Sequence, residues 1–156
     1  MKKMKEGISF FKPNLDESHS IPLTSNNISA GFHSPADDFK EIRISLDKEI
    51  VKNEEATFYA RVDGESMLGA GLNDGDLIVI DRSEEPKNGS IAVCFLDGEF
   101  TVKRLKLKNK EIYLMPENSK YSPIKIGEGN ELSIWGIVTY AVSYTHLTLP
   151  TSYPVE

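Results

Sequence analysis

The segment Ser90–Leu107 reads SIAVCFLDGEFTVKRLKL, and it decides the fold class. Two runs with the composition of β-strands flank Asp97 and Gly98, a pair that tolerates the positive φ angles of a two-residue hairpin turn. The segment therefore predicts an antiparallel hairpin with strands at 90–96 and 99–107.

Outside this hairpin, short apolar runs between turn residues predict four more strands. These strands cover residues 57–62, 77–81, 111–115 and 132–142. Residues 45–53 fit a short helix with Ser45 as the N-cap residue. Short strands separated by turn signals are typical of a mainly β fold, so we expect a strongly bent sheet or partial barrel.

The composition divides the chain into three parts. Residues 1–40 are rich in Ser, Asn, Pro and Asp and lack periodicity, so we expect a flexible arm, with Phe10 and Phe11 as possible anchors on the body or on a second subunit. Residues 41–142 form the expected domain. Residues 143–156 lose the strand rhythm and resemble translated sequencing-adapter sequence, so we assign them no function.

Length and charge limit the function classes. The chain has 156 residues and a net charge of −6, which suits one domain and disfavours sequence-specific DNA binding. No apolar run approaches the roughly 20 residues that span a bilayer, so we expect a cytoplasmic protein without membrane contact. Cys94 is the only cysteine, which excludes an internal disulfide and fits a buried position in a reducing compartment.

A serine with no obvious partner base is the first candidate for chemistry. Ser66 follows Gly64, at the end of a predicted strand and before a turn-rich stretch. A serine hydroxyl needs a base, but His19, His33 and His146 lie in the expected arm and tail. A buried neutral lysine can act instead, if its pKa falls from ~10.4 towards ~7–8.

Lys103 is the lysine best placed for that role. Side chains alternate along a strand, so Lys103 shares a face with Leu105, and we expect this face to point inward. Arg104 and Lys106 lie on the opposite face, towards solvent. Since a lysine in a strand is most often a solvated side chain, the pattern by itself leaves both interpretations open.

The acidic residues before the predicted strand at 77–81 suggest no metal site. Asp74 and Asp76 belong to the stretch Asn73–Asp76, whose composition is that of a tight turn. We therefore expect no metal and no cofactor.

Six short motifs follow one another at compatible spacing. They are Gly31-Phe32-x-Ser34-Pro35-Ala36, Gly64-Glu65-Ser66-Met67, Asp74-Gly75-Asp76-Leu77, Asp97–Leu105, Asn118-Ser119-x-Tyr121-Ser122-Pro123-Ile124 and Trp135-Gly136-Ile137-Val138. This set resembles the LexA/UmuD-like family of self-cleaving serine peptidases. The resemblance implies that family's bent-sheet peptidase domain, with Ser66 as the nucleophile and Lys103 as the general base.

The resemblance also implies that the chain cuts itself. The scissile bond would be Ala30–Gly31, where small residues let the backbone lie flat in a narrow cleft. The backbone N–H of Ser66, with that of Glu65, would form the oxyanion hole.

Partners follow from the resemblance as well. A RecA–single-stranded DNA filament would promote cleavage by favouring the conformer in which the arm occupies the cleft. The processed homodimer would join a UmuC-type polymerase subunit as the accessory part of an error-prone translesion DNA polymerase in the SOS response.

Three alternatives stay open. A LexA-type repressor would need a helix-turn-helix domain before the cut, and residues 1–30 show no three-helix pattern. A non-catalytic polymerase-binding module would have no need of both Ser66 and Lys103. A relative of signal peptidase would carry a membrane anchor, which the hydropathy pattern does not predict.

Overall fold

The computed structural model of the chain describes residues 10–16, 20–24 and 41–144. Its larger sheet contains eight strands. They are β1 (Phe10–Phe11), β4 (Thr57–Arg61), β5 (Leu77–Asp81), β6 (Ile91–Leu96), β7 (Glu99–Lys108), β8 (Glu111–Met115), β9 (Ile124–Lys125) and β10 (Leu132–Val142). The remaining elements are a second sheet of β2 (Ser20–Thr24) and β3 (Glu41–Ser45), the helix α1 (Leu46–Ile50) and the 3-10 helix η1 (Leu68–Ala70).

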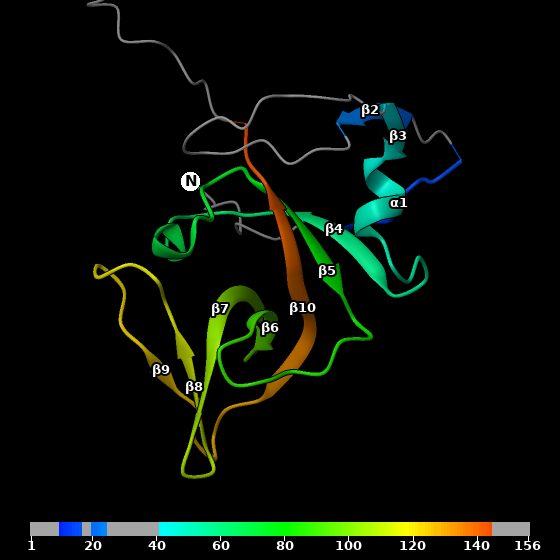
Figure 1. Ribbon diagram of the computed structural model, residues 1–156. Helices are drawn as coiled ribbons and strands as arrows, with labels where there is room; N and C mark the ends of the chain where they lie inside the picture. The colour runs from blue at the N-terminus through cyan, green and yellow to red at the C-terminus, as the bar shows by residue number, and fades with distance from the viewer. Residues whose placement is uncertain (1–9, 17–19, 25–40, 145–156) are drawn as a thin grey trace, which may run out of the picture.

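The larger sheet is antiparallel and open. Its strand order is β1-β4-β5-β10-β6-β7-β8-β9, so the last strand in the chain lies near the middle of the sheet (Figure 1). The mainly β fold and the bent, unclosed sheet predicted from the sequence are confirmed. The predicted helix is shorter than expected: α1 ends at Ile50, and Ser45 takes the N-cap position without a side-chain capping bond.

The bend is concentrated in β10. Its register shifts between Val138 and Tyr140 on the β5 side, and between Ile134 and Gly136 on the β6 side. A Cβ atom on Gly136 would lie 2.5 Å from the Ile80 side chain, so only glycine allows this close crossing. Such irregularities sharpen the local twist and curve the sheet.

The bent sheet encloses two apolar clusters. The first packs β4, β5 and the segment after β4; its buried members are Ala60, Val62, Met67, Leu72, Ile78, Ile80, Val93 and Val102. The second lies under β6–β8; its buried members are Ala92, Cys94, Leu105, Leu114 and Ile137. The predicted burial of Cys94 is confirmed. Both clusters contain residues of β6 and β7, so this hairpin is held from both faces.

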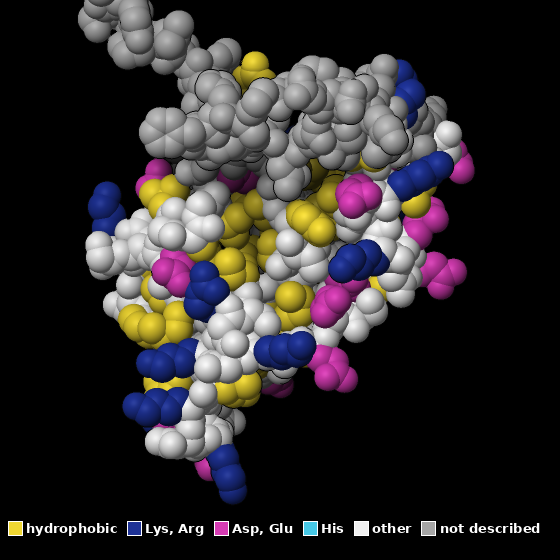
Figure 2. Space-filling model, in the orientation of Figure 1, with side chains coloured by type: hydrophobic (Ala, Val, Ile, Leu, Met, Phe, Trp, Pro, Cys, Tyr) yellow, Lys and Arg dark blue, Asp and Glu magenta, His cyan; other side chains and the backbone are white. Residues whose placement is uncertain are grey.

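The β6–β7 hairpin forms as predicted. Asp97 and Gly98 have φ angles of 49° and 86°, as a type I′ turn requires. Lys103 and Leu105 are buried, whereas Arg104 is half-buried and Lys106 is exposed. Figure 2 shows Lys and Arg side chains gathered at the lower end of the molecule, where β7–β9 lie in the same view.

Part of the expected arm pairs with the body. Phe10 and Phe11 form a short edge strand against β4, and the ring of Phe10 packs 4.3 Å from that of Trp135 and 5.0 Å from that of Phe100. Residues 20–24 pair with β3. These short pairings were missed because pieces of two and five residues carry too little periodicity to be recognised.

Trp135 lies at the centre of this aromatic group. Besides Phe10, it contacts Phe58 at a ring distance of 4.9 Å, and Arg82 stacks on its face at 4.6 Å. Trp135 is partly buried and packs against the first apolar cluster. Within the described residues, no helix has the length and apolar composition needed to cross a bilayer.

Candidate active site

The structure brings Ser66 and Lys103 into contact. The Nζ atom of Lys103 lies 2.9 Å from Oγ of Ser66, although the two residues are 37 positions apart in the sequence. Ser66 is half-buried and faces a cleft, while Lys103 is only 8% exposed. The pair predicted from the sequence therefore lies at hydrogen-bonding distance, with the serine on the solvent side.

Lys103 is surrounded by neutral oxygen atoms. Besides Ser66, its Nζ atom donates to Thr101 Oγ1 at 2.7 Å and to the Val102 carbonyl at 3.1 Å. None of the ion pairs found among the described residues involves Lys103. A neutral amine has two N–H donors and one lone pair. If Thr101 and Val102 accept the two N–H groups, the lone pair is left to point at the hydroxyl of Ser66.

Burial lowers the pKa of Lys103 below its ordinary value. The cause is desolvation, which penalises the ammonium form in an apolar surrounding. Cys94 opposes this shift only as a thiolate, and burial raises the pKa of that thiol to about 11. Cys94 is thus uncharged near neutral pH and does not offset the downward shift of the Lys103 pKa there.

The register of the hairpin places Lys103. It pairs with Ala92 of β6, and its neighbours Val102 and Leu105 are buried in the two apolar clusters. A slip of one residue would turn Lys103 to the other face of the sheet and remove Val102 and Leu105 from the clusters in which they pack. The position of the amine is therefore set by the same contacts that stabilise the sheet.

Ser66 is held in an irregular segment between β4 and η1. Gly64 has a φ angle of +93°, a conformation that glycine adopts without strain, and its N–H donates to Asp74 Oδ1 at 2.8 Å. Met67, next to the serine, is 2% exposed and anchors the segment in the first apolar cluster. The backbone thus turns sharply at Gly64 and presents Ser66 above a buried residue.

A second segment, just after β8, clamps the serine from the other side. The N–H of Glu117 donates to the carbonyl of Ser66 at 2.8 Å, and the Glu117 carbonyl accepts from Gly69 N–H at 2.6 Å. Asn118 Nδ2 donates to the carbonyl of Glu65 at 2.8 Å. The motif that begins at Asn118 carries the resemblance, but the sequence does not predict the bond of Asn118 to Glu65 or that of Glu117 to Ser66, because each joins residues about 50 positions apart.

Two backbone N–H groups belong to residues that line the cleft. Within the described part of the chain, no acceptor is bonded to the N–H of Glu65 or to that of Ser66. Both residues lie in the lining of the cleft. Two adjacent N–H groups without internal partners can bind a carbonyl oxygen that develops negative charge.

The cleft over this pair has a volume of about 430 Å³. One wall is the segment Val62–Met67, and the other is Glu99–Lys103 of β7. Tyr121, which is 45% exposed, contributes to the rim. The shape is that of an open groove between two lengths of backbone, which suits an extended peptide better than a compact small molecule.

The other residues singled out from the sequence fall into two groups. Asp74 and Asp76 accept backbone hydrogen bonds from Gly64 and Asn73, so the predicted turn is confirmed. No cluster of three metal-ligating side chains occurs among the described residues. Other predicted positions lie outside the described residues: the proposed scissile pair Ala30 and Gly31, and the histidines His19, His33 and His146.

Comparison with known proteins assigns this site to a family. The peptidase S24-like family matches residues 22–139, which include both walls of the cleft. The chain belongs to the peptidase S24-like family. Membership of this family of serine peptidases confirms the resemblance drawn from the motifs and agrees with the open, bent sheet.

Relatives of the S24-like chain cover most of its length. Protein MucA of Salmonella typhimurium is 42% identical over 125 residues, which are 80% of this chain and 85% of that protein. Protein SamA of the same species is 42% identical over 129 residues, or 83% and 89% of the two chains. The LexA repressor of Oleidesulfovibrio alaskensis is 48% identical over 75 residues, which are 48% of this chain and 36% of the repressor.

Proposed function

We propose that this S24-like chain is a self-cleaving serine peptidase that cuts its own Ala30–Gly31 bond. Ser66 is the nucleophile, Lys103 the general base, and the N–H groups of Glu65 and Ser66 the oxyanion hole. The observation that carries the proposal is the 2.9 Å contact between Lys103 Nζ and Ser66 Oγ, made by a lysine whose pKa is lowered by burial.

The chemistry begins with one proton transfer. The neutral amine of Lys103 takes the hydroxyl proton of Ser66 as Oγ attacks the carbonyl carbon of Ala30. The oxyanion is bound by backbone N–H groups, and the ammonium then returns the proton to the departing amine of Gly31 as the C–N bond breaks. Water, deprotonated by the same lysine, hydrolyses the ester on Ser66 and restores both groups.

The shape of the site supports an extended substrate. The cleft runs between two backbone segments and is open to solvent on one side. Burial of Lys103 lowers the pKa of its amine, which can therefore act as the base of the site without a histidine. Small residues such as Ala30 and Gly31 would let a peptide backbone approach Ser66 closely.

The cellular role is inferred from the relatives. Similarity over most of the chain to MucA and SamA supports an SOS-mutagenesis role of the UmuD type. In this role the processed homodimer is the accessory subunit of an error-prone translesion polymerase with a UmuC-type partner, and a RecA–single-stranded DNA filament promotes cleavage. The match to LexA covers only 36% of the repressor, which gives no support for a repressor function.

Incubation of the purified chain at increasing pH, with and without RecA filaments, tests the proposal by mass spectrometry of the fragments. Cleavage in the absence of RecA should accelerate with pH as Lys103 loses its proton, and then level off. Ser66→Ala and Lys103→Ala should each lower the rate by about 1,000-fold or more, because the two residues act as a unit.

Lys106→Ala provides a matched control, because this lysine lies on the same strand but is exposed. It should cleave like the unmodified chain and yield a fragment that begins at Gly31. An intact chain under all conditions would refute the proposal and favour a non-catalytic polymerase-binding module. A fragment that still forms in Ser66→Ala would refute the role of Ser66 as the nucleophile.

A further inference from the structure

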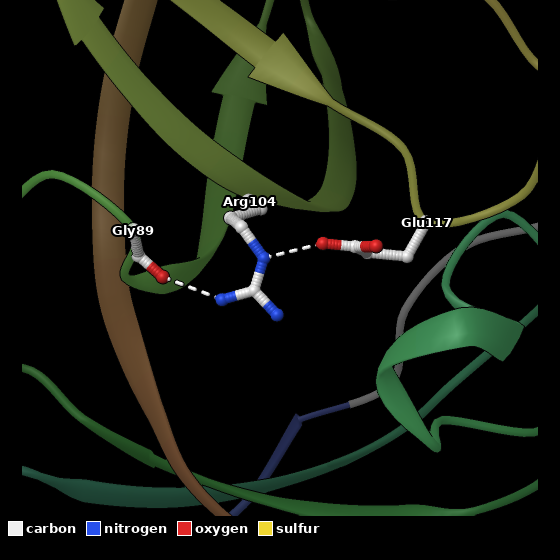
Figure 3. A network of polar contacts seen from close by, with 3 residues as sticks. All are labelled: Gly89, Arg104 and Glu117. Atoms are coloured by element: carbon white, nitrogen blue, oxygen red, sulfur yellow. Dashed lines mark hydrogen bonds and ion pairs between the residues drawn. The ribbon is translucent and has the colours of Figure 1, made fainter.

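A polar bridge joins the strand of Lys103 to the segment that clamps Ser66. Arg104 follows Lys103 on β7, and its Nε donates to Glu117 Oε1 at 2.5 Å. Its Nη1 donates to the carbonyl of Gly89 at 2.7 Å. Figure 3 shows the guanidinium between these two acceptors, so one side chain ties β7 to two separate loops.

Glu117 is the residue through which this bridge reaches the serine. Its side chain accepts from Arg104, while its backbone N–H donates to the carbonyl of Ser66 and its carbonyl accepts from Gly69 N–H. Lys103 and Ser66 are therefore connected through only two residues, Arg104 and Glu117.

Few other contacts hold the clamp segment in place. Residues 116–123 form no helix or strand, and the only side chain of this segment bonded to the serine loop is that of Asn118, which binds the carbonyl of Glu65. The bonds from Glu117 and Asn118 set the clamp relative to Ser66, but neither sets it relative to β7. On the β7 side, the ladder between β7 and β8 ends at the pair Arg104–Met115, and the Arg104 side chain adds a bond to Glu117 two residues beyond it.

We infer that Arg104 and Glu117 are a positioning pair that sets the distance between Ser66 Oγ and Lys103 Nζ. This inference rests on the proposed function for its effect on cleavage, but the geometry it concerns can be measured separately. Neither side chain lines the cleft, so neither is a catalytic residue. The pair acts by holding the serine loop in register with the strand of the base.

The test compares the ion pair of Arg104 and Glu117 with a second, more exposed ion pair of the same sheet. Glu117→Ala removes the carboxylate but keeps the backbone bonds to Ser66 and Gly69. The control is Glu111→Ala, which breaks the pair between Glu111 and Lys125 on neighbouring strands, away from the serine loop. We expect Glu117→Ala to slow self-cleavage by about 10- to 100-fold, since small misplacements of reacting groups are costly. Glu111→Ala should cleave at the unmodified rate.

A thiol placed at position 66 reports on the proximity of the Lys103 amine without any cleavage. In a Ser66→Cys background, the pH dependence of alkylation by iodoacetamide gives the pKa of the new thiol. The ammonium of Lys103 should hold this pKa below the ordinary value of about 8.5. Cys94 is fully buried and should not compete. Adding Lys103→Met should raise the thiol pKa, which checks the probe.

Adding Glu117→Ala to the probe background should raise the thiol pKa by about one unit, and adding Glu111→Ala should leave it unchanged. If Glu117→Ala changes neither the thiol pKa nor the cleavage rate, the inference is wrong. If the Ser66→Ala chain still cleaves itself, the proposed function is wrong. The inference about Arg104 and Glu117 is then tested by the thiol pKa alone.

Two further, conservative variants test whether slower cleavage comes from lost positioning or only from unfolding. Glu117→Gln keeps the side-chain length and an acceptor for Arg104, so its effects should be smaller but in the same direction. Arg104→Lys keeps the charge but cannot bond Glu117 and Gly89 as a planar fork. Its cleavage rate should therefore lie between that of Arg104→Ala and that of the unmodified chain. Equal rates for Arg104→Lys, Arg104→Ala and the unmodified chain would overturn the inference.

Discussion

The two halves of the candidate site are built in different ways. Lys103 lies in a regular hairpin, where ladder bonds to β6 and burial on both faces determine its position. Ser66 lies in an irregular segment held by single hydrogen bonds: Asp74 accepts one from the segment, and Glu117 and Asn118 each donate one to it. The base is therefore fixed by the fold as a whole, while the nucleophile depends on a few local contacts.

This difference predicts which substitutions lower both stability and cleavage activity and which lower activity first. A change near Lys103 disturbs two apolar clusters and should cost stability together with activity. A change in the hydrogen bonds around Ser66 should cost activity first, because the apolar contacts of Met67 and Leu72, which stabilise the segment, are kept. Substitutions in the serine loop and in the hairpin can test this contrast.

The largest effect is expected from Gly69→Ala. A Cβ atom at this position would lie 2.7 Å from the carbonyl oxygen of Glu117, so the clamp must shift. We expect a loss of about 1–3 kcal/mol in the free energy of unfolding from overpacking. Cleavage should fall by about 10- to 100-fold, because the displaced Glu117 also holds the carbonyl of Ser66. Chemical denaturation and single-turnover cleavage measure the two quantities.

Gly71→Ala is the matched control for this prediction. Gly71 has a φ angle of +81°, so alanine is strained by about 1–2 kcal/mol, but its Cβ atom would meet no other group within 4 Å. The control should lose stability while keeping the cleavage rate. If both variants slow cleavage equally, the clamp has no specific role and only the stability of the loop matters.

The same contrast explains what could be predicted from the sequence. The strands, the Asp97-Gly98 turn and the inward face of Lys103 follow from alternation and turn chemistry, which are properties of neighbouring residues. The contacts of Glu117 with Ser66 and Gly69 could not be predicted, because no local pattern encodes a meeting of two irregular segments. Resemblance to a family pointed to Ser66, but the sequence did not show what holds it.

The edge strand β1 illustrates the same limit. The sequence suggests Phe10 and Phe11 as anchors, yet their place on β4 depends on the aromatic group of Phe58, Phe100 and Trp135. Those rings come from three distant parts of the chain. Periodicity can identify the strands of a sheet. Which residues cover the edge of the sheet depends on side chains that come together only in the folded chain.

Thr101→Val should have a smaller effect on the hairpin side. The hydroxyl of Thr101 accepts a hydrogen bond from Lys103 Nζ at 2.7 Å, and valine removes this acceptor with little change of shape. The ammonium form loses more than the neutral amine, so the pKa of Lys103 should fall further and the pH–rate profile should move to lower pH. The plateau rate at high pH should drop by about 10-fold, because the amine loses one of the contacts that orient it.

Thr139→Val controls for the loss of a threonine hydroxyl. Thr139 lies on β10, where its Oγ1 donates to the carbonyl of Val79, and it lines no part of the cleft. Its pH–rate profile should match that of the unmodified chain. A profile that moves to higher pH in Thr101→Val would contradict the prediction, since it would mean that the hydroxyl favours the neutral amine.

The smallest effect concerns stability and comes from the buried amine itself. Burial lowers the pKa of Lys103 in the folded chain, whereas the unfolded chain has the ordinary value of about 10.4. Between these two values the unfolded chain binds one more proton, so this residue makes the free energy of unfolding rise with pH by about 1.4 kcal/mol per unit. Its contribution is complete above the unfolded pKa and is lost as the pH falls through the window to the folded pKa.

Lys103→Met, made in a Ser66→Ala background that keeps the chain intact, should remove this dependence. The buried thiol of Cys94 and the hydroxyl of Tyr59 also titrate at high pH, with pKa values raised to about 11 and about 12, and they act in the opposite direction. Both chains retain these groups, so the difference between the two urea-unfolding curves isolates the lysine. The methionine variant should gain relative stability as the pH falls from about 10 towards neutrality. A difference that does not change with pH would mean that Lys103 keeps its ordinary pKa, and a charged amine at this position could not act as the base.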